Sequence, residues 1–316
     1  MKSLKKNDRI LITGGTGLIG TNLNNALREQ GYESNAIGSS QYDLRDLTAV
    51  KLAFTEYKPT VVFHLAAKVG GIFANNTYKA DFYSDNVLIN THVVNESINH
   101  GVEYMFAMGT GCAYPKRLEG SVLLEKDFLD GVPEITNDAY AYAKRGLLVH
   151  LEALAENEQI NYTYCLPANI YGAHDNYHPT HSHVVPGLIR RFCEAKDGGL
   201  SEVKIWGDGS AKRDFLYIDD CVAAMILLAE KGLSGPVNIA TGELTSIADL
   251  AVAIKQASKF SGNIEHNLSF PTGQKERLFD LERIKSIGWE AKHSLEDGLE
   301  KTVEWFEKNK NNIRER

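Results

Sequence analysis

The sequence predicts an α/β fold: a doubly wound parallel sheet followed by a smaller mixed α/β lobe. Short apolar segments alternate with stretches of helical periodicity through the first half of the 316 residues. Strands and helices that alternate in this way build a parallel sheet covered by helices. The segments predicted as strands are 9–13, 61–66, 104–108 and 162–166, and those predicted as helices are 18–30, 46–57, 79–100 and 140–158.

A glycine-rich turn follows the first predicted strand and opens the first predicted helix. This is the context in which such a turn binds a dinucleotide. Gly14 permits the tight turn, Gly17 lets a pyrophosphate approach the backbone, and Gly20 lets the helix pack on the strand. The pyrophosphate then rests on the helix N-terminus. The spacing is Gly-x-x-Gly-x-x-Gly, and the alternative is a plain strand–helix turn with incidental glycines. The expected cofactor contacts here are Gly14, Gly15, Thr16, Gly17, Leu18, Ile19 and Gly20.

The alternation of strands and helices weakens after about residue 170. We therefore expect a nucleotide-binding Rossmann domain at residues 1–170 and a mainly substrate-binding lobe at 171–316, with some strands and helices of the lobe returning to the first domain. Residues 173–183 are rich in His, Asn, Asp and Pro, and they predict a long loop. Long loops in compact domains are usually functional or disordered.

Composition excludes several classes of function. With 43% hydrophobic and 24% charged residues, the chain has the composition of a soluble globular protein. A net charge of −7 argues against nucleic acid as a partner, so an anionic substrate would need a local arginine cluster. No apolar run could span a bilayer, and residues 1–6 lack the apolar core of a signal peptide. Four widely spaced cysteines predict neither a disulfide framework nor a metal site, and they favour a reducing cytoplasm.

Cofactor choice is decided at the end of the second strand, where an acid would bind the ribose hydroxyls of NAD. Segment 36–41 has no acid and carries Ser39 and Ser40, whose small hydroxyl side chains leave room for a 2′-phosphate. No arginine lies in that segment, and an ordinary polar turn is the alternative. NADP is therefore favoured over NAD. Asp43 and Leu44 follow and suit the adenine edge.

Tyr140 and Lys144 lie four residues apart, on one face of a predicted helix. An ammonium group near a phenol favours the phenolate, so we expect the pKa of Tyr140 to be lowered. Such a phenol can exchange a proton with a carbonyl/alcohol pair. Combined with the glycine turn, the pair indicates hydride chemistry at an oxygenated carbon.

With Thr110, these motifs resemble the extended short-chain dehydrogenase/reductases, and further segments are similar to the GDP-L-fucose synthase family. The resemblance covers nearly the whole chain. It implies an NADPH-dependent 3,5-epimerase and 4-reductase of a GDP-4-keto-6-deoxyhexose. The segments that carry it are 68–72, 75–78, 112–116, 169–176 and 182–186.

The resemblance also implies the role of each residue. Tyr140 matches the acid that protonates O4, and Lys144 matches the residue that holds the nicotinamide ribose. Thr110 stands where the family usually has serine. Cys112 and His183 match the epimerisation pair. Gly111 replaces a common serine, and the absence of an acidic pair after Thr110 argues against dehydration.

The remaining expected contacts belong to the cofactor and the substrate. For the cofactor they are Leu65, Ala66, Ala67, Met108, Gly109, Lys144, Pro167, Asn169, Ile170 and His183. For the substrate they are Val69, Gly70, Asn169, Arg191, Trp206, Arg213 and Arg277. Guanidinium groups match phosphate oxygens, so Arg190, Arg191, Arg213 and Arg277 are candidates for a diphosphate clamp. Arg190 and Arg191 are adjacent and must point in different directions. A core aromatic is the alternative for Trp206.

Epimerisation has its own chemical logic. A 4-keto group acidifies the protons on C3 and C5, so a base can remove one and an acid on the opposite face can return one. A stabilised thiolate can be the base, and histidine is the natural acid near neutral pH. The alternatives are a small buried hydrophobe for Cys112 and a loop histidine facing water for His183.

Two other functions remain open at this point. One is C4 reduction of another GDP-4-keto sugar, such as a heptose, with one or no epimerisation. The other is a non-catalytic NADP-binding scaffold, which would not need the Tyr140 and Lys144 pair. The resemblance further implies a homodimer through a four-helix contact formed by helices near 79–100 and 138–158.

Overall fold

The central element of the protein is a six-stranded parallel sheet with the strand order β11-β6-β4-β3-β1-β2. The structure is a computed structural model that describes residues 3–269 and 276–315. The predicted α/β fold with a parallel sheet is confirmed. The strands are β1 (Arg9–Thr13), β2 (Glu33–Ile37), β3 (Val61–His64), β4 (Tyr104–Met108), β6 (Asn161–Pro167) and β11 (Gly235–Ile239).

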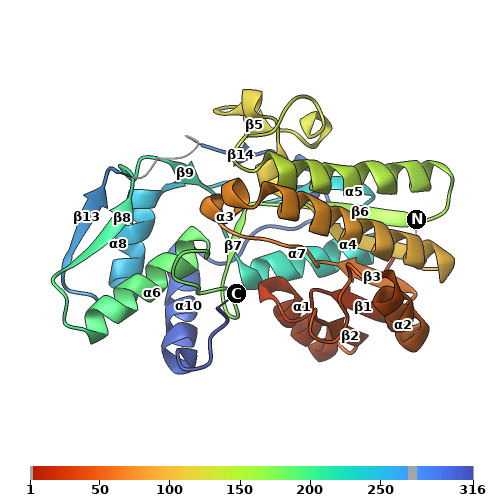
Figure 1. Ribbon diagram of the computed structural model, residues 1–316, viewed down its shortest axis with the longest axis horizontal. Coiled ribbons are helices and arrows are strands. Elements are labelled where there is room, and N and C mark those ends of the chain that lie inside the picture. Colours follow the sequence, from red (N-terminus) through yellow and green to blue (C-terminus); the bar gives the residue numbers. More distant parts are fainter. Residues whose placement is uncertain (1–2, 270–275, 316) are drawn as a thin grey trace.

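Helices cover both faces of this sheet. On one face α4 and α5 lie side by side, and on the other α1 packs against α7 (Figure 1). The four helices predicted from periodicity are present within one or two residues of their expected ends. Their bounds are α1 (Leu18–Glu29), α2 (Leu47–Tyr57), α4 (Lys79–Asn99) and α5 (Asp138–Glu156). A helix that we did not predict, α7, spans Ile218–Lys231.

The central strands are apolar along their whole length because helices bury both of their faces. Every residue of β3 and β4 is buried, and Phe63 and Phe106 stack across the two strands at a centroid distance of 5.3 Å. Thr13 and His64 are polar exceptions to this pattern in β1 and β3, and both are fully buried. They lie where β1 and β3 end, which is the edge that faces the candidate site.

The order in which strands are added to the sheet changes side at β1. From β1 the chain passes to β2 on one side and then returns to β3 on the other. Ligands of open α/β sheets bind in the crevice at such a switch point. Gly14, directly after β1, has a φ of +71°, and a Cβ atom there would lie 2.8 Å from the backbone nitrogen of Ala66. The glycine turn is therefore held against the segment that follows β3.

The second half of the chain is divided between the sheet and a smaller group of elements. Strand β11 pairs with β6 at the edge of the sheet, and helix α7 packs against α1 and β6. The other long elements lie together at the left of the view in Figure 1. These are α6 (Val184–Asp197), β8 (Glu202–Trp206), α8 (Ile247–Ala257), β13 (Asn263–Asn267) and α10 (Leu295–Asn309). The short elements are α3 (Ile72–Thr77), β5 (Val122–Leu123), β7 (Asn169–Tyr171), β9 (Lys212–Arg213), β10 (Phe215–Tyr217), β12 (Thr245–Ser246), β14 (Leu278–Phe279) and α9 (Glu282–Lys285), with single-turn helices η1 (Gly111–Ala113), η2 (Lys116–Leu118) and η3 (Glu125–Asp127).

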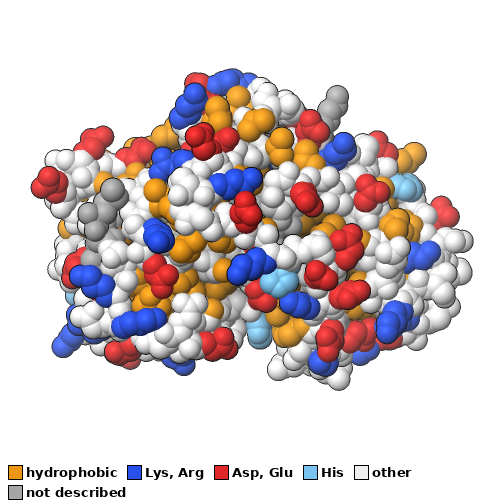
Figure 2. All heavy atoms as spheres, turned by 180° about the vertical axis from the view of Figure 1, so that it is seen from behind, with side chains coloured by type: hydrophobic (Ala, Val, Ile, Leu, Met, Phe, Trp, Pro, Cys, Tyr) orange, Lys and Arg blue, Asp and Glu red, His pale blue; other side chains and the backbone are white. Residues whose placement is uncertain are grey.

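Acidic and basic side chains are interspersed on the face opposite to that of Figure 1, and a notch interrupts the lower edge of the outline (Figure 2).

All four cysteines are free. Among the described residues, no helix is both long and apolar enough to cross a membrane. The same residues contain no cluster of His, Cys, Asp or Glu suited to a metal ion.

Candidate active site

The glycine turn lies at the carboxyl edge of the sheet, as its position after β1 requires. Gly17 is the N-cap of α1 in an extended conformation, and the first turn of the helix carries no acidic side chain. Leu18, Ile19 and Gly20 form that first turn. Backbone N–H groups of the turn therefore meet no carboxylate from their own helix, which leaves them suited to bind an anion.

The residues expected at the adenosine end lie just beyond β2. Ser39 and Ser40 are exposed there, and Leu44 is buried. The Asp43 carboxylate accepts hydrogen bonds from Arg45 Nε at 2.9 Å and Nη2 at 2.7 Å, and these bonds lower its pKa. Arg45 was not predicted as a cofactor contact because it lies outside segment 36–41, but the turn brings it back beside Asp43.

Tyr140 and Lys144 lie one turn apart on α5, with the Lys144 nitrogen 5.9 Å from the centre of the phenol ring. The expected lowering of the Tyr140 pKa is wrong: burial, reinforced by the nearby Cys112, raises it. Burial also lowers the pKa of Lys144 to about 8. The ammonium donates at 2.8 Å to the Met108 carbonyl and makes no hydrogen bond to the phenol. The phenol therefore keeps its proton at neutral pH.

A chain of buried hydrogen bonds fixes α5 against the carboxyl ends of β1 and β3. Thr13 Oγ1 lies 2.8 Å from His64 Nδ1, and His64 Nε2 lies 3.0 Å from Asn90 Oδ1 on α4. Asn90 Nδ2 donates to the carbonyl of Ala143, the residue before Lys144. Burial lowers the pKa of His64 to about 3, so its ring is neutral. His64 and Asn90 were not predicted to support the site, although a histidine in an apolar strand is a visible signal.

Thr110, Cys112 and Arg277 come together at the start of η1. Thr110 Oγ1 accepts a hydrogen bond from the Cys112 nitrogen at 3.2 Å, and Arg277 Nη1 lies 3.0 Å from Cys112 Sγ. Burial alone would raise the pKa of the thiol. The charge and hydrogen bond of Arg277, with smaller effects of Thr110 and Arg213, outweigh burial and lower the pKa. The alternative of an inert buried cysteine does not fit this environment, because such thiols have raised pKa values.

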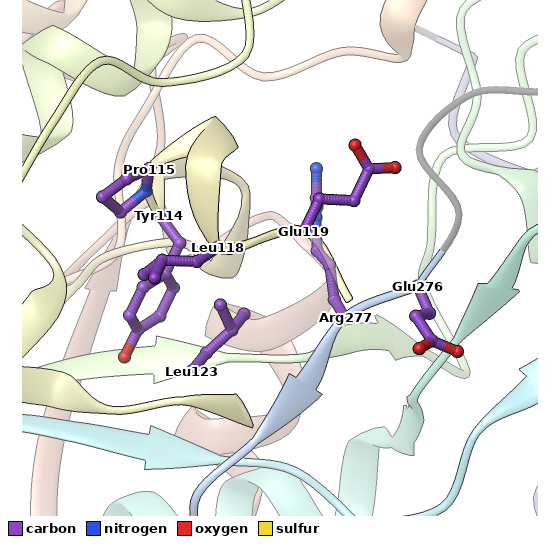
Figure 3. A pocket seen from close by; sticks show the side chains of 7 residues that line it. All are labelled: Tyr114, Pro115, Leu118, Glu119, Leu123, Glu276 and Arg277. Carbon is purple, nitrogen blue, oxygen red and sulfur yellow. The ribbon is translucent and has the colours of Figure 1, made fainter. Parts of the chain in front are cut away.

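Arg277 also borders a small pocket beside β5 and β14. Tyr114, Leu118 and Leu123 form its apolar side, and Glu119, Glu276 and Arg277 lie across from them (Figure 3). The charge of Arg277 also reaches Arg213 on β9. Burial, and then Arg277, lower the pKa of Arg213 to about 10. Two of the four arginines expected to bind phosphate thus share one region, next to the thiol.

The other two arginines point in different directions, as their adjacency on α6 requires. Arg190 is paired with Glu194 and Glu315. Arg191 donates to the carbonyl of Lys204 at 2.9 Å, and its guanidinium lies 5.2 Å from the centre of the Trp206 ring. Trp206 is 44% exposed, so it is not the core aromatic that was the alternative.

Residues 173–183, the histidine-rich loop, contain neither helix nor strand, as predicted. One residue of the loop, Asn176, forms an isolated bridge with Arg314. His183 is the N-cap of α6. Its charge acts on Asp175, a carboxyl group only 4% exposed that the sequence did not single out. Within the described residues, no hydrogen bond joins His183 to Cys112. The pairing of His183 with Cys112 as acid and base stays a prediction.

The remaining expected contacts lie around the same edge of the sheet. Leu65, Ala66 and Ala67 follow β3; Met108 ends β4, with Gly109 next; Pro167 ends β6; Asn169 and Ile170 begin β7. Gly109 donates to the Cys165 carbonyl at 2.7 Å. Val69 is exposed, and Gly70 lies beside Gly71, whose nitrogen donates to the carbonyl of His181 in the histidine-rich loop.

Comparison with known proteins agrees with this arrangement. Residues 10–240 match the NAD dependent epimerase/dehydratase family. GDP-L-fucose synthase 1 of Arabidopsis thaliana is 38% identical over 307 residues, covering 96% of this chain and 94% of its own. GDP-L-fucose synthase of Escherichia coli K12 is 34% identical over 317 residues, covering 97% and 98%.

Solved structures extend the likeness to three dimensions. A GDP-L-fucose synthetase from Naegleria fowleri bound to NADP has a TM-score of 0.89 and 31% identity, covering 99% of this chain and 96% of its own. A GDP-6-OMe-4-keto-L-xylo-heptose reductase from Campylobacter jejuni has a TM-score of 0.90 and 28% identity, covering 97% and 99%. By sequence and by structure, the chain belongs to the NAD dependent epimerase/dehydratase family and, within it, to the GDP-L-fucose synthase family.

Proposed function

We propose that this protein is an NADPH-dependent 3,5-epimerase and 4-reductase that converts a GDP-4-keto-6-deoxyhexose to GDP-L-fucose or a close relative. The observation that carries the proposal is the contact between Arg277 and Cys112, two residues from Thr110. A pure reductase has no use for a cysteine whose pKa is lowered by an arginine close to the proposed proton donor. The names and substrates of the relatives support the same activity.

NADP fits the residues present. The uncapped turn at Gly17 suits a pyrophosphate, and the exposed Ser39 and Ser40, without an acid in segment 36–41, suit a 2′-phosphate. When bound, the reduced nicotinamide supplies a hydride for C4. We place the cofactor mainly in residues 1–170 and the sugar nucleotide mainly against residues 171–316.

In the proposed epimerisation, the Cys112 thiolate removes a proton from the carbon next to the keto group. His183 returns a proton to the opposite face, which inverts the centre. Arg277 stabilises the thiolate before the reaction, when the base must be free of its proton. The guanidinium is thus a positioning residue for the base, in addition to the substrate contact that the resemblance implies.

In the proposed reduction, Tyr140 protonates O4 of the sugar. The raised pKa of the phenol suits this direction, because the group carries its proton at neutral pH. Thr110 lies at the same edge and can donate a hydrogen bond to O4. Lys144 is fixed by its bond to the Met108 carbonyl and would hold the nicotinamide ribose, the role that the resemblance implies.

The test is to incubate the protein with NADPH and a GDP-4-keto-6-deoxyhexose and to solve the product by NMR. Inversion at both C3 and C5 with a reduced C4 is the expected result. A second candidate is C4 reduction of a GDP-4-keto heptose with one or no epimerisation. The likeness to the heptose reductase favours it. A product with C3 and C5 unchanged would select this candidate.

We also propose a homodimer in the cytoplasm. Helices α4 and α5 carry large apolar side chains that are exposed, and a two-fold contact between these helices would bury them. The free cysteines suit a reducing compartment. The exposed residues are Tyr83 and Leu88 on α4, and Tyr142 and Val149 on α5.

A further inference from the structure

The last described residues lead from the end of α10 to the start of α1. The end of the chain lies between α10 and α1 (Figure 1). The carbonyl of Arg314 accepts a hydrogen bond from the Tyr177 nitrogen at 2.9 Å. Arg190 donates to the Tyr177 carbonyl and is also paired with Glu315. Residues 310–315, which we call the strap, are thus tied to the histidine-rich loop on both sides of Tyr177.

The strap brings one guanidinium to the glycine turn. A Cβ atom at Gly17 would lie 3.2 Å from Arg314 Nη1. Residue 314 is separated from residue 17 by almost the whole chain, so only the fold creates this approach. The histidine-rich loop is held at the same place, because Asn22 of α1 donates to the carbonyl of Ala173 at 3.0 Å.

The electrostatics of this position favour an anion. The N-terminus of α1 carries a partial positive charge, and no acidic side chain of its first turn offsets it. A guanidinium at the same point adds a charge of the same sign. Asp175, a buried carboxyl group of the histidine-rich loop, interacts electrostatically with Arg314, and burial raises its pKa to about 6. Two positive groups that converge on one turn are suited to a ligand with two adjacent negative groups.

We propose that the Arg314 guanidinium binds the pyrophosphate of the dinucleotide on the side opposite the glycine turn. The inference rests on the proposed cofactor but not on the identity of the sugar. The turn supplies backbone N–H groups from one side and the strap supplies a guanidinium from the other. Arg314 is thereby a cofactor-binding residue contributed by the strap, outside the sequence that forms the nucleotide-binding sheet.

The test measures NADPH binding without any sugar nucleotide, by the quenching of protein fluorescence. Arg314→Gln removes the charge. Arg314→Lys keeps the charge but lacks the two parallel N–H donors of a guanidinium. Lys308→Gln is the matched control, because it removes one charge from an exposed lysine of α10 that pairs with Glu304. Adenosine 2′-monophosphate, which has the 2′-phosphate but no pyrophosphate, is the second ligand and is measured by displacement of NADPH.

We expect Arg314→Gln to weaken NADPH binding about tenfold or more, the usual loss for a charge-assisted hydrogen bond. Arg314→Lys should lose less, and Lys308→Gln should bind as the wild type does. Affinity for adenosine 2′-monophosphate should stay within about twofold in all variants, because that ligand does not reach the turn. Wild-type NADPH affinity in both Arg314 variants, or an equal loss for both ligands, would overturn the proposal. If Arg314→Gln does not fold, Arg314→Lys decides by the same comparison of ligands.

Failure here and failure of the proposed function have different signatures. An enzyme that epimerises and reduces the sugar while Arg314→Gln binds NADPH normally refutes only the role of Arg314. A protein that binds NADPH through Arg314 yet leaves every keto sugar unchanged refutes only the proposed reaction.

Discussion

Arg277 Nη1 lies 3.0 Å from Cys112 Sγ, although the two residues are 165 positions apart in the chain. Arg277 directly precedes β14, which pairs with β5, and Cys112 lies in η1 directly after β4. Burial alone would raise the pKa of this thiol, but the contact with Arg277, with smaller effects of Thr110 and Arg213, lowers it. This pair is the structural basis for assigning a base to the site.

The Arg277 contact predicts the pH dependence of alkylation at Cys112. Because the thiol pKa is lowered, the thiolate should form and react with iodoacetamide at a lower pH than an ordinary thiol does. Arg277→Gln should move the midpoint up by about one pH unit or more, and Arg277→Lys should move it less. Peptide mass spectrometry gives the rate at each cysteine separately.

Two controls accompany this measurement. Arg283→Gln removes a guanidinium that instead donates to the Ser234 carbonyl, so it should leave the midpoint unchanged. Cys193 and Cys221 are buried and have pKa values raised to about 12, so they should react slowly throughout. An unchanged midpoint in Arg277→Gln would mean that another group stabilises the thiolate.

Cys112→Ser should abolish the uptake of solvent deuterium at C3 and C5 of the keto sugar, because a serine hydroxyl is a far weaker acid than a thiol. Reduction should survive and yield the unepimerised alcohol. His183→Asn should allow exchange to continue while inversion falls, since the proton can leave but is not returned from the other face. NMR of the recovered sugar in deuterated buffer checks both. Exchange at the wild-type rate in Cys112→Ser would favour the reductase function.

Tyr140→Phe should lower the rate of reduction by about 10²–10⁴-fold, the usual contribution of a general acid. Cofactor binding should persist, because the Lys144 ammonium bonds to the Met108 carbonyl and not to the phenol. Single-turnover oxidation of NADPH gives the rate, and fluorescence titration gives the affinity. A near-native rate would show that a different group donates the proton to O4.

NADPH should bind at least about tenfold more tightly than NADH, because the turn after β2 offers hydroxyl groups in place of a ribose-binding acid. Isothermal titration calorimetry with each cofactor measures the ratio. Arg45→Gln should reduce the preference if this guanidinium leaves Asp43 to meet the 2′-phosphate. Equal affinities for the two cofactors would contradict the assignment of NADP.

The protein should be a dimer in solution at micromolar concentration, through α4 and α5. Light scattering measures the mass. Val149→Glu places a charge on the exposed apolar face of α5 and should shift the mass toward the monomer. Leu200→Glu is the matched control, because Leu200 is also exposed but lies beyond the end of α6. A monomeric wild type would exclude the four-helix contact.

The sequence by itself determined the parallel arrangement of the sheet, its strands β1, β3, β4 and β6, its first helices and the glycine turn. These depend on local patterns: apolar runs, helical periodicity, and glycine directly after a strand. The Tyr140 and Lys144 pair is likewise local, since four residues make one helical turn. Short-range geometry allowed both to be placed correctly before any tertiary contact was known.

Tertiary structure alone decided the electrostatics of the site. The direction of the Tyr140 pKa was predicted wrongly because it depends on burial, which spacing along a helix does not reveal. The contacts of Arg277 with Cys112 and of Arg314 with the turn at Gly17 join residues far apart in the chain. Charge interactions depend on distance in space and on the surrounding dielectric, and both are fixed only when the chain has folded.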